Sequence, residues 1–328
     1  ILFISTTALG SLMTISSNNW MLMWMGLEIN LLSIIPLMSN TKNKVESEAA
    51  MKYFITQALA STVFMLSIIM MLYNSTDIKT TKSLIMDSAM MTKMGAAPFH
   101  FWFPEVMQGL SWMNSMIMLT WQKIAPMIVF MYLPKSMTFL TMSIITSMLI
   151  SGTMGLNQTD LRKILAYSSI NHIGWMMATM ISNQTIWTIY MTIYIITTVN
   201  MIMVFKTMKT YKISQLMNSM NKNKHMKLLF SMNFLSLGGI PPFIGFYPKW
   251  ILIMSMIEKS QNLLTLIMII STLITLFFYM RITFTTLTMS TAETLKIKIT
   301  KINNLKIMLL NTTTLSSMIL CPMMLSFL

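Results

Sequence analysis

The chain has 328 residues, of which 55% are hydrophobic and only 10% are charged, and its mean hydropathy is +0.65. Because soluble domains carry about 25% charged residues, this composition excludes an ordinary soluble fold. The formal net charge of +14 comes from basic residues spread along the chain rather than gathered on one polar face, so we expect no nucleic-acid binding. A single cysteine, Cys321, excludes an internal disulfide and a thiolate metal cage.

Windows of about 20 apolar residues recur along the sequence, and each can cross a hydrocarbon core of about 30 Å as a helix. They lack the alternation of barrel strands, so the sequence predicts an all-α, polytopic membrane protein. The first window has no basic start and no cleavage site, so we expect no cleavable signal peptide. No large polar stretch intervenes, which predicts one transmembrane domain over residues 1–328. The eleven predicted spans are 1–17, 20–38, 51–73, 83–98, 106–133, 136–155, 164–181, 185–205, 228–257, 262–282 and 305–327.

The basic residues predict an orientation for these spans. Fourteen of the 23 Lys and Arg residues fall in loops after even-numbered spans, whereas the loops on the other side hold only Lys79, Lys82, Lys135 and Lys259. The positive-inside rule therefore places the N-terminus and the even loops in the charge-retaining compartment, with the C-terminus opposite. The densest basic loop, Lys206–Lys227, is expected to set topology or to contact anionic lipid headgroups or a partner subunit.

Gly and Pro residues interrupt the fourth and the ninth predicted spans. The interrupting segments are KMGAAPFHFWFP at 93–104 and GGIPPFIGFYPK at 238–249. Proline removes a backbone donor and collides with the preceding turn, so neither span can remain a continuous helix. Non-helical backbone at membrane depth is tolerated only inside protein or beside a wet cavity, and paired interruptions point to an ion path. We therefore predict two discontinuous helices beside such a path, with structural kinks and incidental lysines as the alternative.

Four ionisable residues lie inside or beside apolar spans: Glu28, Lys93, Lys123 and Lys249. A charge at the centre of a membrane helix costs at least about 2.5–3.5 kcal/mol, so its default interpretation is functional. Lys123 is at least about ten residues, or roughly 15 Å, from either end of its predicted helix, whereas its side chain reaches only about 6 Å. It therefore cannot place its ammonium at the interface. Lys249 could lie nearer the surface, because the segment beside it is unwound. Together the four residues predict a proton or ion path.

Three further polar residues admit two interpretations each. Glu105 begins a span, where an acid complements the helix dipole, so a structural role and a proton-path role both remain open. His172 ends the polar run SSINH (168–172) and could either hydrogen-bond across helices or belong to a water chain. His100, in the first interruption, could relay protons or brace the loop. No His, Cys and Asp spacing is typical of a metal site and no Gly-rich phosphate cradle occurs, so we expect neither metal nor cofactor here.

At these motifs the chain resembles the subunit 2 family of NADH dehydrogenase, the mitochondrially encoded, antiporter-like membrane subunits of respiratory complex I. The similarity is greatest to insect members. The chain opens with Ile1 rather than Met, so an unusual start codon and a few missing residues are both open. The matching segments are MGLEINLLSIIPLMS (25–39), KYFITQALAS (52–61), KMGAAPFHFWFPEVMQGLSWMN (93–114), LTWQKIAPM (119–127), GLNQTDLRKILAYSSINHIGWM (155–176) and NFLSLGGIPPFIGFYPKW (233–250).

The resemblance implies an antiporter-like fold with inverted repeats and a role in the proton-pumping NADH:ubiquinone oxidoreductase of the mitochondrial inner membrane. NADH, FMN, iron–sulfur clusters and ubiquinone would bind other subunits. Glu28 and Lys93 match the family's coupled acid–base pair, Lys123 its central lysine, and Lys249 the lysine of its second broken helix. The resemblance also implies other membrane-arm subunits and lipids such as cardiolipin as partners, rather than a stand-alone monomer. The N-terminus would face the matrix and the C-terminus the intermembrane space.

Two other functions remain open from the residues. A cation/proton antiporter subunit shares the fold and the buried Glu and Lys residues, and sodium-dependent transport by the chain would favour it. A non-pumping structural scaffold of the membrane arm would bury the same charges only to pair them with partners, and neutral substitutions would then leave pumping unchanged.

Overall fold

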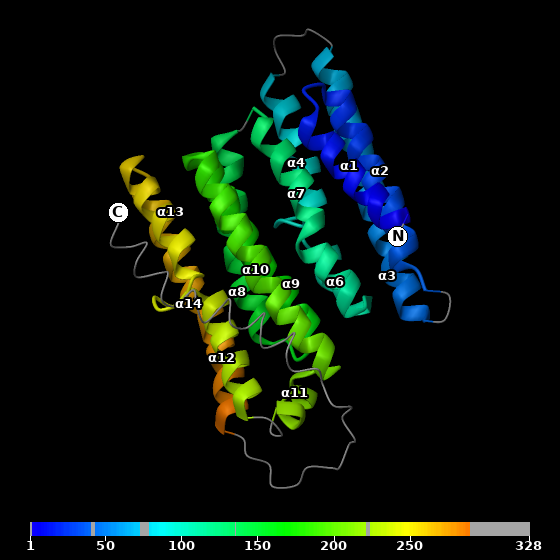
Figure 1. The fold of residues 1–328 in the computed structure, drawn as a ribbon. Helices are drawn as coiled ribbons and strands as arrows, with labels where there is room; N and C mark the ends of the chain where they lie inside the picture. The colour runs from blue at the N-terminus through cyan, green and yellow to red at the C-terminus, as the bar shows by residue number, and fades with distance from the viewer. Residues whose placement is uncertain (1, 41–42, 73–78, 135, 221–223, 289–328) are drawn as a thin grey trace. The chain divides into compact units, whose positions relative to one another are not determined.

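The computed structural model describes residues 2–40, 43–72, 79–134, 136–220 and 224–288 (Figure 1). Over these ranges the secondary structure is helical, apart from an isolated bridge between Asp160 and Lys212, which confirms the predicted all-α class. Five of the described helices are long and apolar enough to cross a membrane. The predicted span at 305–327 lies outside the described residues, as does Cys321. The chain divides into two compact units, residues 1–147 and 148–328.

The first unit begins with helices that match the predicted spans closely. Two of them extend beyond the apolar windows into polar sequence, because hydropathy marks only the apolar part of a helix. The span predicted at 106–133 is divided into three helices. The helices are α1 (Leu2–Ser16), α2 (Trp20–Met38), α3 (Lys44–Leu72), α4 (Lys79–Met94), α5 (Trp102–Gly109), α6 (Trp112–Leu119) and α7 (Trp121–Tyr132), and α8 (Met137–Leu156) contains the boundary between the units.

Small residues allow α1 and α2 to lie in close contact, as Figure 1 shows for the two helices nearest the N-terminus. A Cβ atom added to Gly10 would lie 2.9 Å from the backbone nitrogen of Asn30 and from the carbonyl oxygen of Gly26. One added to Gly26 would lie 2.6 Å from the Thr14 methyl group. In a membrane, where lipid is as apolar as leucine, such backbone approach is a principal source of helix association. The packing of α1 thus fixes the part of α2 that carries Glu28.

The first predicted interruption is present between α4 and α5. Helix α4 ends at Met94, and Gly95 follows with a φ of +74°, a left-handed conformation that favours glycine. The Gly95 amide donates to the Thr92 carbonyl at 3.2 Å, and the Ala96 amide donates to the Met91 carbonyl at 3.0 Å. These two bonds form a Schellman motif, which satisfies carbonyl groups that the end of a helix leaves unpaired.

The prediction of one continuous helix over 106–133 is wrong. Helix α6 ends at Leu119, Thr120 has φ and ψ of −110° and −73°, and α7 starts at Trp121. Pro126 cannot donate an amide hydrogen to the carbonyl of Gln122, and its ring crowds the preceding turn. The helix is therefore interrupted just before that turn, and this break lies close to Lys123.

The second unit contains a polar helix that is surrounded by others. Helix α9 is buried along almost its whole length, although its residues include serine, asparagine and histidine. Helix α11, in the basic loop between Lys206 and Lys227, was not predicted. The helices are α9 (Leu161–Ser182), α10 (Gln184–Met208), α11 (Ile213–Met220), α12 (Lys224–Gly238), α13 (Phe246–Glu258) and α14 (Asn262–Thr288). Helices α10, α13 and α14 all pack against α9.

The second predicted interruption, between α12 and α13, repeats the geometry of the first. Gly239 follows the end of α12 with a φ of +79°, and its amide and that of the next residue make the same pair of bonds as at Gly95. When the two segments are aligned on these glycines, a Pro-Phe pair and a further proline follow at equal spacing in both. The alignment places Lys249 opposite Glu105 and not opposite Lys93. The two lysines near the breaks therefore stand at different positions of the repeated motif.

Candidate proton-path site

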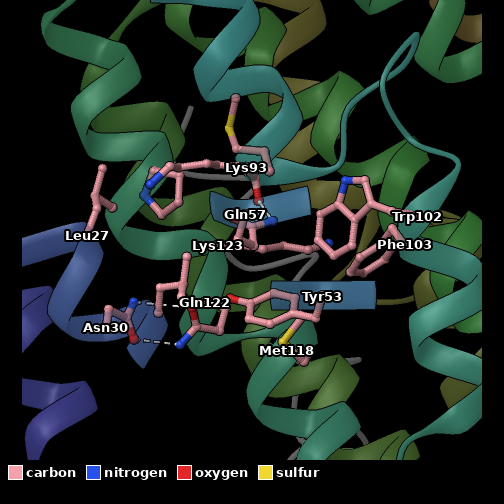
Figure 2. Close-up of a pocket in the computed structure, with 13 residues that line it drawn as sticks. Leu27, Asn30, Tyr53, Gln57, Lys93, Trp102, Phe103, Met118, Gln122 and Lys123 are labelled. Carbon is pink, nitrogen blue, oxygen red and sulfur yellow. Dashed lines mark hydrogen bonds between the residues drawn. The ribbon is translucent and has the colours of Figure 1, made fainter. Parts of the chain in front are cut away.

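A small cavity in the first unit brings together two of the predicted lysines. Its volume is about 20 Å³, and both Lys93 and Lys123 line it (Figure 2). A single water molecule needs at least about 10–15 Å³ of such space together with polar partners, so the cavity has room for about one. Polar side chains of Asn30, Tyr53 and Gln122 share its wall. The cavity offers a place where water could contact both ammonium groups.

Lys93 belongs to the last turn of α4, immediately before the first interruption, and its side chain is buried. Gln57 of α3 donates a long hydrogen bond of 3.5 Å to the Lys93 carbonyl. Cations are favoured near the C-terminal end of a helix, because the exposed carbonyl groups there carry partial negative charge. The position of Lys93 therefore stabilises an ammonium that burial alone would disfavour.

Glu28 lies on α2 beside this cavity and is partly exposed. Its carboxylate interacts electrostatically with the ammonium of Lys93, although no ion pair within 4.0 Å joins the two described side chains. One carboxylate oxygen, Oε2, is buried and has no hydrogen-bond partner among the described residues. Glu28 and Lys93 are thus coupled through space, at a separation that a movement of either helix would change.

Lys123 is the most deeply buried of the predicted lysines, with only 2% of its surface exposed. Its ammonium nitrogen lies 5.0 Å from the centre of the Phe103 ring, at which distance the ring face attracts a cation. Phe103 belongs to α5, directly after the first interruption, so the break also places the ring that Lys123 contacts.

An amide network that the sequence analysis did not identify links the helices around the cavity. Asn30 donates to Gln122 at 3.2 Å, and Gln122 donates back to Asn30 at 2.7 Å (Figure 2). Tyr53 donates to the same Gln122 oxygen at 3.4 Å. The sequence does show an amide side chain close to two of the charged residues, because Asn30 follows Glu28 by two residues and Gln122 precedes Lys123. Sequence could not reveal that these amides meet.

Lys249 is buried in the second unit, on the first turn of α13. Its ammonium donates a hydrogen bond of 2.9 Å to the carbonyl of Gly238, and it lies 5.8 Å from the centre of the Trp175 ring. Lys249 is thus held at the carbonyl end of α12. Its side chain is only 6% exposed, because the segment after Gly239 folds back against α12, where Gly245 lies on the backbone of Ser236.

His172 of α9 is buried against two aromatic residues of α10. A hydrogen bond of 2.9 Å joins its Nδ1 to the hydroxyl of Tyr190, and its ring centre lies 5.1 Å from that of Tyr194. The neighbouring Asn171 donates to the Thr275 hydroxyl of α14 at 3.2 Å. The polar run on α9 therefore contacts polar groups on two other helices, which suits both interpretations of His172.

The other two polar candidates lie elsewhere. Glu105 is exposed at the start of α5 and forms an ion pair of 3.1 Å with Lys52 of α3. His100 is buried in the first interruption, where its Nδ1 lies 3.3 Å from the Pro98 carbonyl oxygen. Neither residue lines the cavity that Lys93 and Lys123 share.

Two buried charged residues of α4 were not among the predicted site residues. Asp87 is 1% exposed and accepts a hydrogen bond of 3.4 Å from the Ser136 hydroxyl. Lys82, which the topology analysis placed in a loop, is buried in the first turn of α4 because that helix begins four residues before the predicted span. Asp87 could have been identified from the sequence, because it is an acid inside the apolar span predicted at 83–98. Within the described ranges, no group of three or more His, Cys, Asp or Glu side chains could hold a metal ion.

Comparison with known proteins defines the class to which this fold belongs. The sequence profile of the NADH:quinone oxidoreductase/Mrp antiporter transmembrane family matches residues 17–275. A chain of respiratory complex I from Thermus thermophilus has the same fold, with a TM-score of 0.86 at 21% identity over 98% of this chain and 77% of that one. A chain of the Mrp complex from Dietzia sp. gives a TM-score of 0.75 at 15% identity, over 85% and 59% of the two chains. The class is therefore that of antiporter-like membrane subunits.

Curated relatives narrow the class further. The chain is 46% identical to NADH-ubiquinone oxidoreductase chain 2 of Anopheles gambiae, over 86% of this chain and 84% of that protein. It is 44% identical to the protein of the same name from Locusta migratoria, over 97% and 94% of the two chains. This chain belongs to the NADH-ubiquinone oxidoreductase chain 2 family.

Proposed function

We propose that this chain is a core membrane-arm subunit of the proton-pumping NADH:ubiquinone oxidoreductase, respiratory complex I, and that it carries a proton path coupled to quinone reduction elsewhere in the complex. The names of its relatives support membership of that complex. The observation that carries the proton path is the cavity that Lys93 and Lys123 both line, with room for about one water molecule.

The proposed mechanism starts at the coupled pair, Glu28 and Lys93. Burial favours the neutral form of a lysine, whereas a nearby carboxylate favours the charged form. When Glu28 is close, Lys93 holds its proton; when Glu28 withdraws, the proton passes through the cavity water to Lys123. Moving one proton against 100 mV requires about 2.3 kcal/mol, which is within the range that a change of this kind in a buried charge pair can supply.

Lys249 and His172 are proposed to continue the path in the second unit. The hydrogen bond from Lys249 to the end of α12 provides a site for a cation at the second break. His172, joined to Tyr190, can exchange a proton through its ring nitrogens. Glu105 is proposed as a further proton-binding residue of the path, nearer the surface of the chain. Its ion pair with Lys52 would compete with proton binding there.

We also propose a location, an orientation and partners for the chain. The chain is a multi-pass protein of the mitochondrial inner membrane, with its N-terminus on the matrix side and its C-terminus on the intermembrane-space side, and residues 1–328 act as one transmembrane domain. Its partners are other membrane-arm subunits and lipids such as cardiolipin. NADH, FMN, iron–sulfur clusters and ubiquinone bind other subunits, and this chain holds no cofactor of its own.

Replacement of Lys123 by methionine tests the proposal, because methionine keeps the length of the side chain and removes its charge. We expect the complex to assemble, proton pumping into sealed membrane vesicles to fall, and coupled quinone reduction to slow. The matched control is Lys206→Met, since Lys206 is exposed at the end of α10. Normal pumping by an assembled Lys123→Met complex would exclude the proposed role of this lysine.

The same vesicles separate the two other functions. A cation/proton antiporter subunit would require sodium, so pumping by the unaltered complex in sodium-free medium counts against it. A structural scaffold predicts that Lys93→Met and Lys123→Met alter the yield of assembled complex but leave the number of protons pumped per NADH oxidised unchanged.

A further inference from the structure

The reciprocal hydrogen bonds between Asn30 and Gln122 connect two helices that each carry a residue of the proposed path. We propose that this amide pair is a latch that holds α2 against α7, and that it thereby sets the position of Glu28 relative to Lys93. The inference rests on the proposed function, because it assigns these two amides as positioning residues for proton transfer through the cavity.

The two amides are close in sequence to the charged residues that they would link. Asn30 is two residues beyond Glu28 on α2, and Gln122 immediately precedes Lys123 on α7. A helix rises about 1.5 Å per residue and moves as a rigid rod over such distances, so a displacement of α2 at Glu28 reaches Asn30 almost undiminished. The hydrogen bonds then transmit it to the backbone next to Lys123.

The chemistry of the pair suits a latch with two states. Each amide donates one hydrogen bond to the other and accepts one from it, at 3.2 Å and 2.7 Å, so the closed pair satisfies both carbonyl groups within the protein. An unpaired amide in an apolar interior is costly, so the pair resists partial opening. If the pair opens, its donors and acceptors face the cavity and can bind water there, which would extend a path between Lys93 and Lys123.

Tyr53 adds a third helix to the latch. Its hydroxyl donates to the Gln122 oxygen at 3.4 Å, and its ring centre lies 5.8 Å from that of Trp102, just after the first break. Neither an amide nor a tyrosine hydroxyl changes charge readily near neutral pH. These side chains therefore position water and helices, whereas Glu28 and the lysines bind the proton.

The test uses the whole complex in sealed membrane vesicles and measures the protons pumped per NADH oxidised, together with the yield of assembled complex. Asn30→Leu and Gln122→Met each remove one amide and keep its approximate shape. We expect each to shift the equilibrium between the closed and the open α2–α7 contact about two- to tenfold, the range that the loss of an interhelical hydrogen bond in a membrane supports, and thereby to lower the proton-to-NADH ratio. The double variant should lose no more than either single variant, because both remove the same interaction.

Two further variants separate positioning from simple packing. The exchange variant, Asn30→Gln with Gln122→Asn, keeps both amides and the summed length of the two side chains, so it should restore the ratio. Tyr53→Phe removes one hydrogen bond to Gln122 without touching the pair and should lower the ratio by a smaller factor. Because Tyr53→Phe keeps the aromatic ring, it provides a result even if the leucine or methionine variants fail to assemble.

Asn114→Leu is the matched control. Asn114 of α6 donates to the Leu37 carbonyl at 2.9 Å, so it also ties an asparagine side chain to α2, but it does not line the cavity. It should leave the proton-to-NADH ratio unchanged. An equal fall in the Asn114 variant, or normal pumping by assembled Gln122→Met and Tyr53→Phe complexes, would overturn the latch. If Lys123→Met still abolishes pumping in that case, the proposed function stands without the latch.

Discussion

The ammonium nitrogen of Lys249 donates a hydrogen bond of 2.9 Å to the carbonyl oxygen of Gly238, the last residue of α12. This carbonyl lies at the negative end of the helix dipole and lacks an intrahelical partner, because the chain leaves the helix there. A break that would otherwise expose unpaired backbone thus becomes a binding site for a buried cation. The lysine gives the unpaired carbonyl a hydrogen-bond donor, and the carbonyl gives the buried ammonium an acceptor.

Substitution at Gly239 should disturb this bond. Alanine there would be strained at a φ of +79°, at a cost of about 1–3 kcal/mol, and its Cβ would lie 2.8 Å from the Lys249 nitrogen. We expect Gly239→Ala to lower both pumping and thermal stability of the complex. Gly238→Ala is the control, since its Cβ would meet only Tyr279 at 3.6 Å and Leu276 at 3.8 Å. Equal effects of the two substitutions would contradict the proposed contact.

The bond between His172 and Tyr190 predicts coupled effects of substitution. Tyr190→Phe removes the hydroxyl that binds the imidazole Nδ1 and keeps the ring. The loss of this hydrogen bond should cost about 0.5–1.5 kcal/mol of the free energy that holds the imidazole in place, and should lower pumping partially. His172→Phe should lower pumping further. Adding Tyr190→Phe to His172→Phe should then have no extra effect. Pumping rates of the three variants check this, and Tyr132→Phe is the control, because Tyr132 is exposed. If the losses from the two substitutions add, the two residues act independently and the prediction fails.

The ion pair between Glu105 and Lys52 should contribute little to stability. Both side chains are about half exposed, at 58% and 45%, and such pairs are typically worth about 0–1 kcal/mol. Glu105→Gln should therefore leave the thermal inactivation temperature of the complex nearly unchanged. Any loss of pumping in this variant then reports on proton transfer rather than on folding. Lys52→Met serves as the comparison, because it breaks the same pair and keeps the acid; a matching loss in both would assign the effect to the pair.

The contact between α1 and α2 should be intolerant of a single methyl group. In Gly10→Ala the new Cβ would lie 2.9 Å from two backbone atoms of α2, so the helices must separate, at a cost of about 1–3 kcal/mol. We expect less assembled complex and a lower inactivation temperature. Ser5→Ala, on the exposed part of α1, should change neither quantity. Because α1 holds the part of α2 near Glu28, residual complexes should also pump less well; unaltered assembly and pumping would show that the helices can adjust.

The two interruptions illustrate what can be predicted from local sequence. Both were expected from their Gly and Pro residues, and both are present at Gly95 and Gly239. The interruption at Thr120 was missed, because Pro126 stands alone and a proline within a membrane helix is often tolerated. The alignment of the two motifs, which places Glu105 and not Lys93 opposite Lys249, was also missed.

The class of protein, its apolar helices and its two paired breaks followed from the sequence alone, because lipid imposes length, hydropathy and backbone pairing on each segment separately. The partners of the buried charges were decided only by the tertiary structure. Asn30 meets Gln122 across 92 residues of chain, and Lys249 meets the end of a helix that precedes it by 11 residues. Such contacts depend on how helices pack against one another, and in lipid that packing is set by small residues and hydrogen bonds that hydropathy does not record.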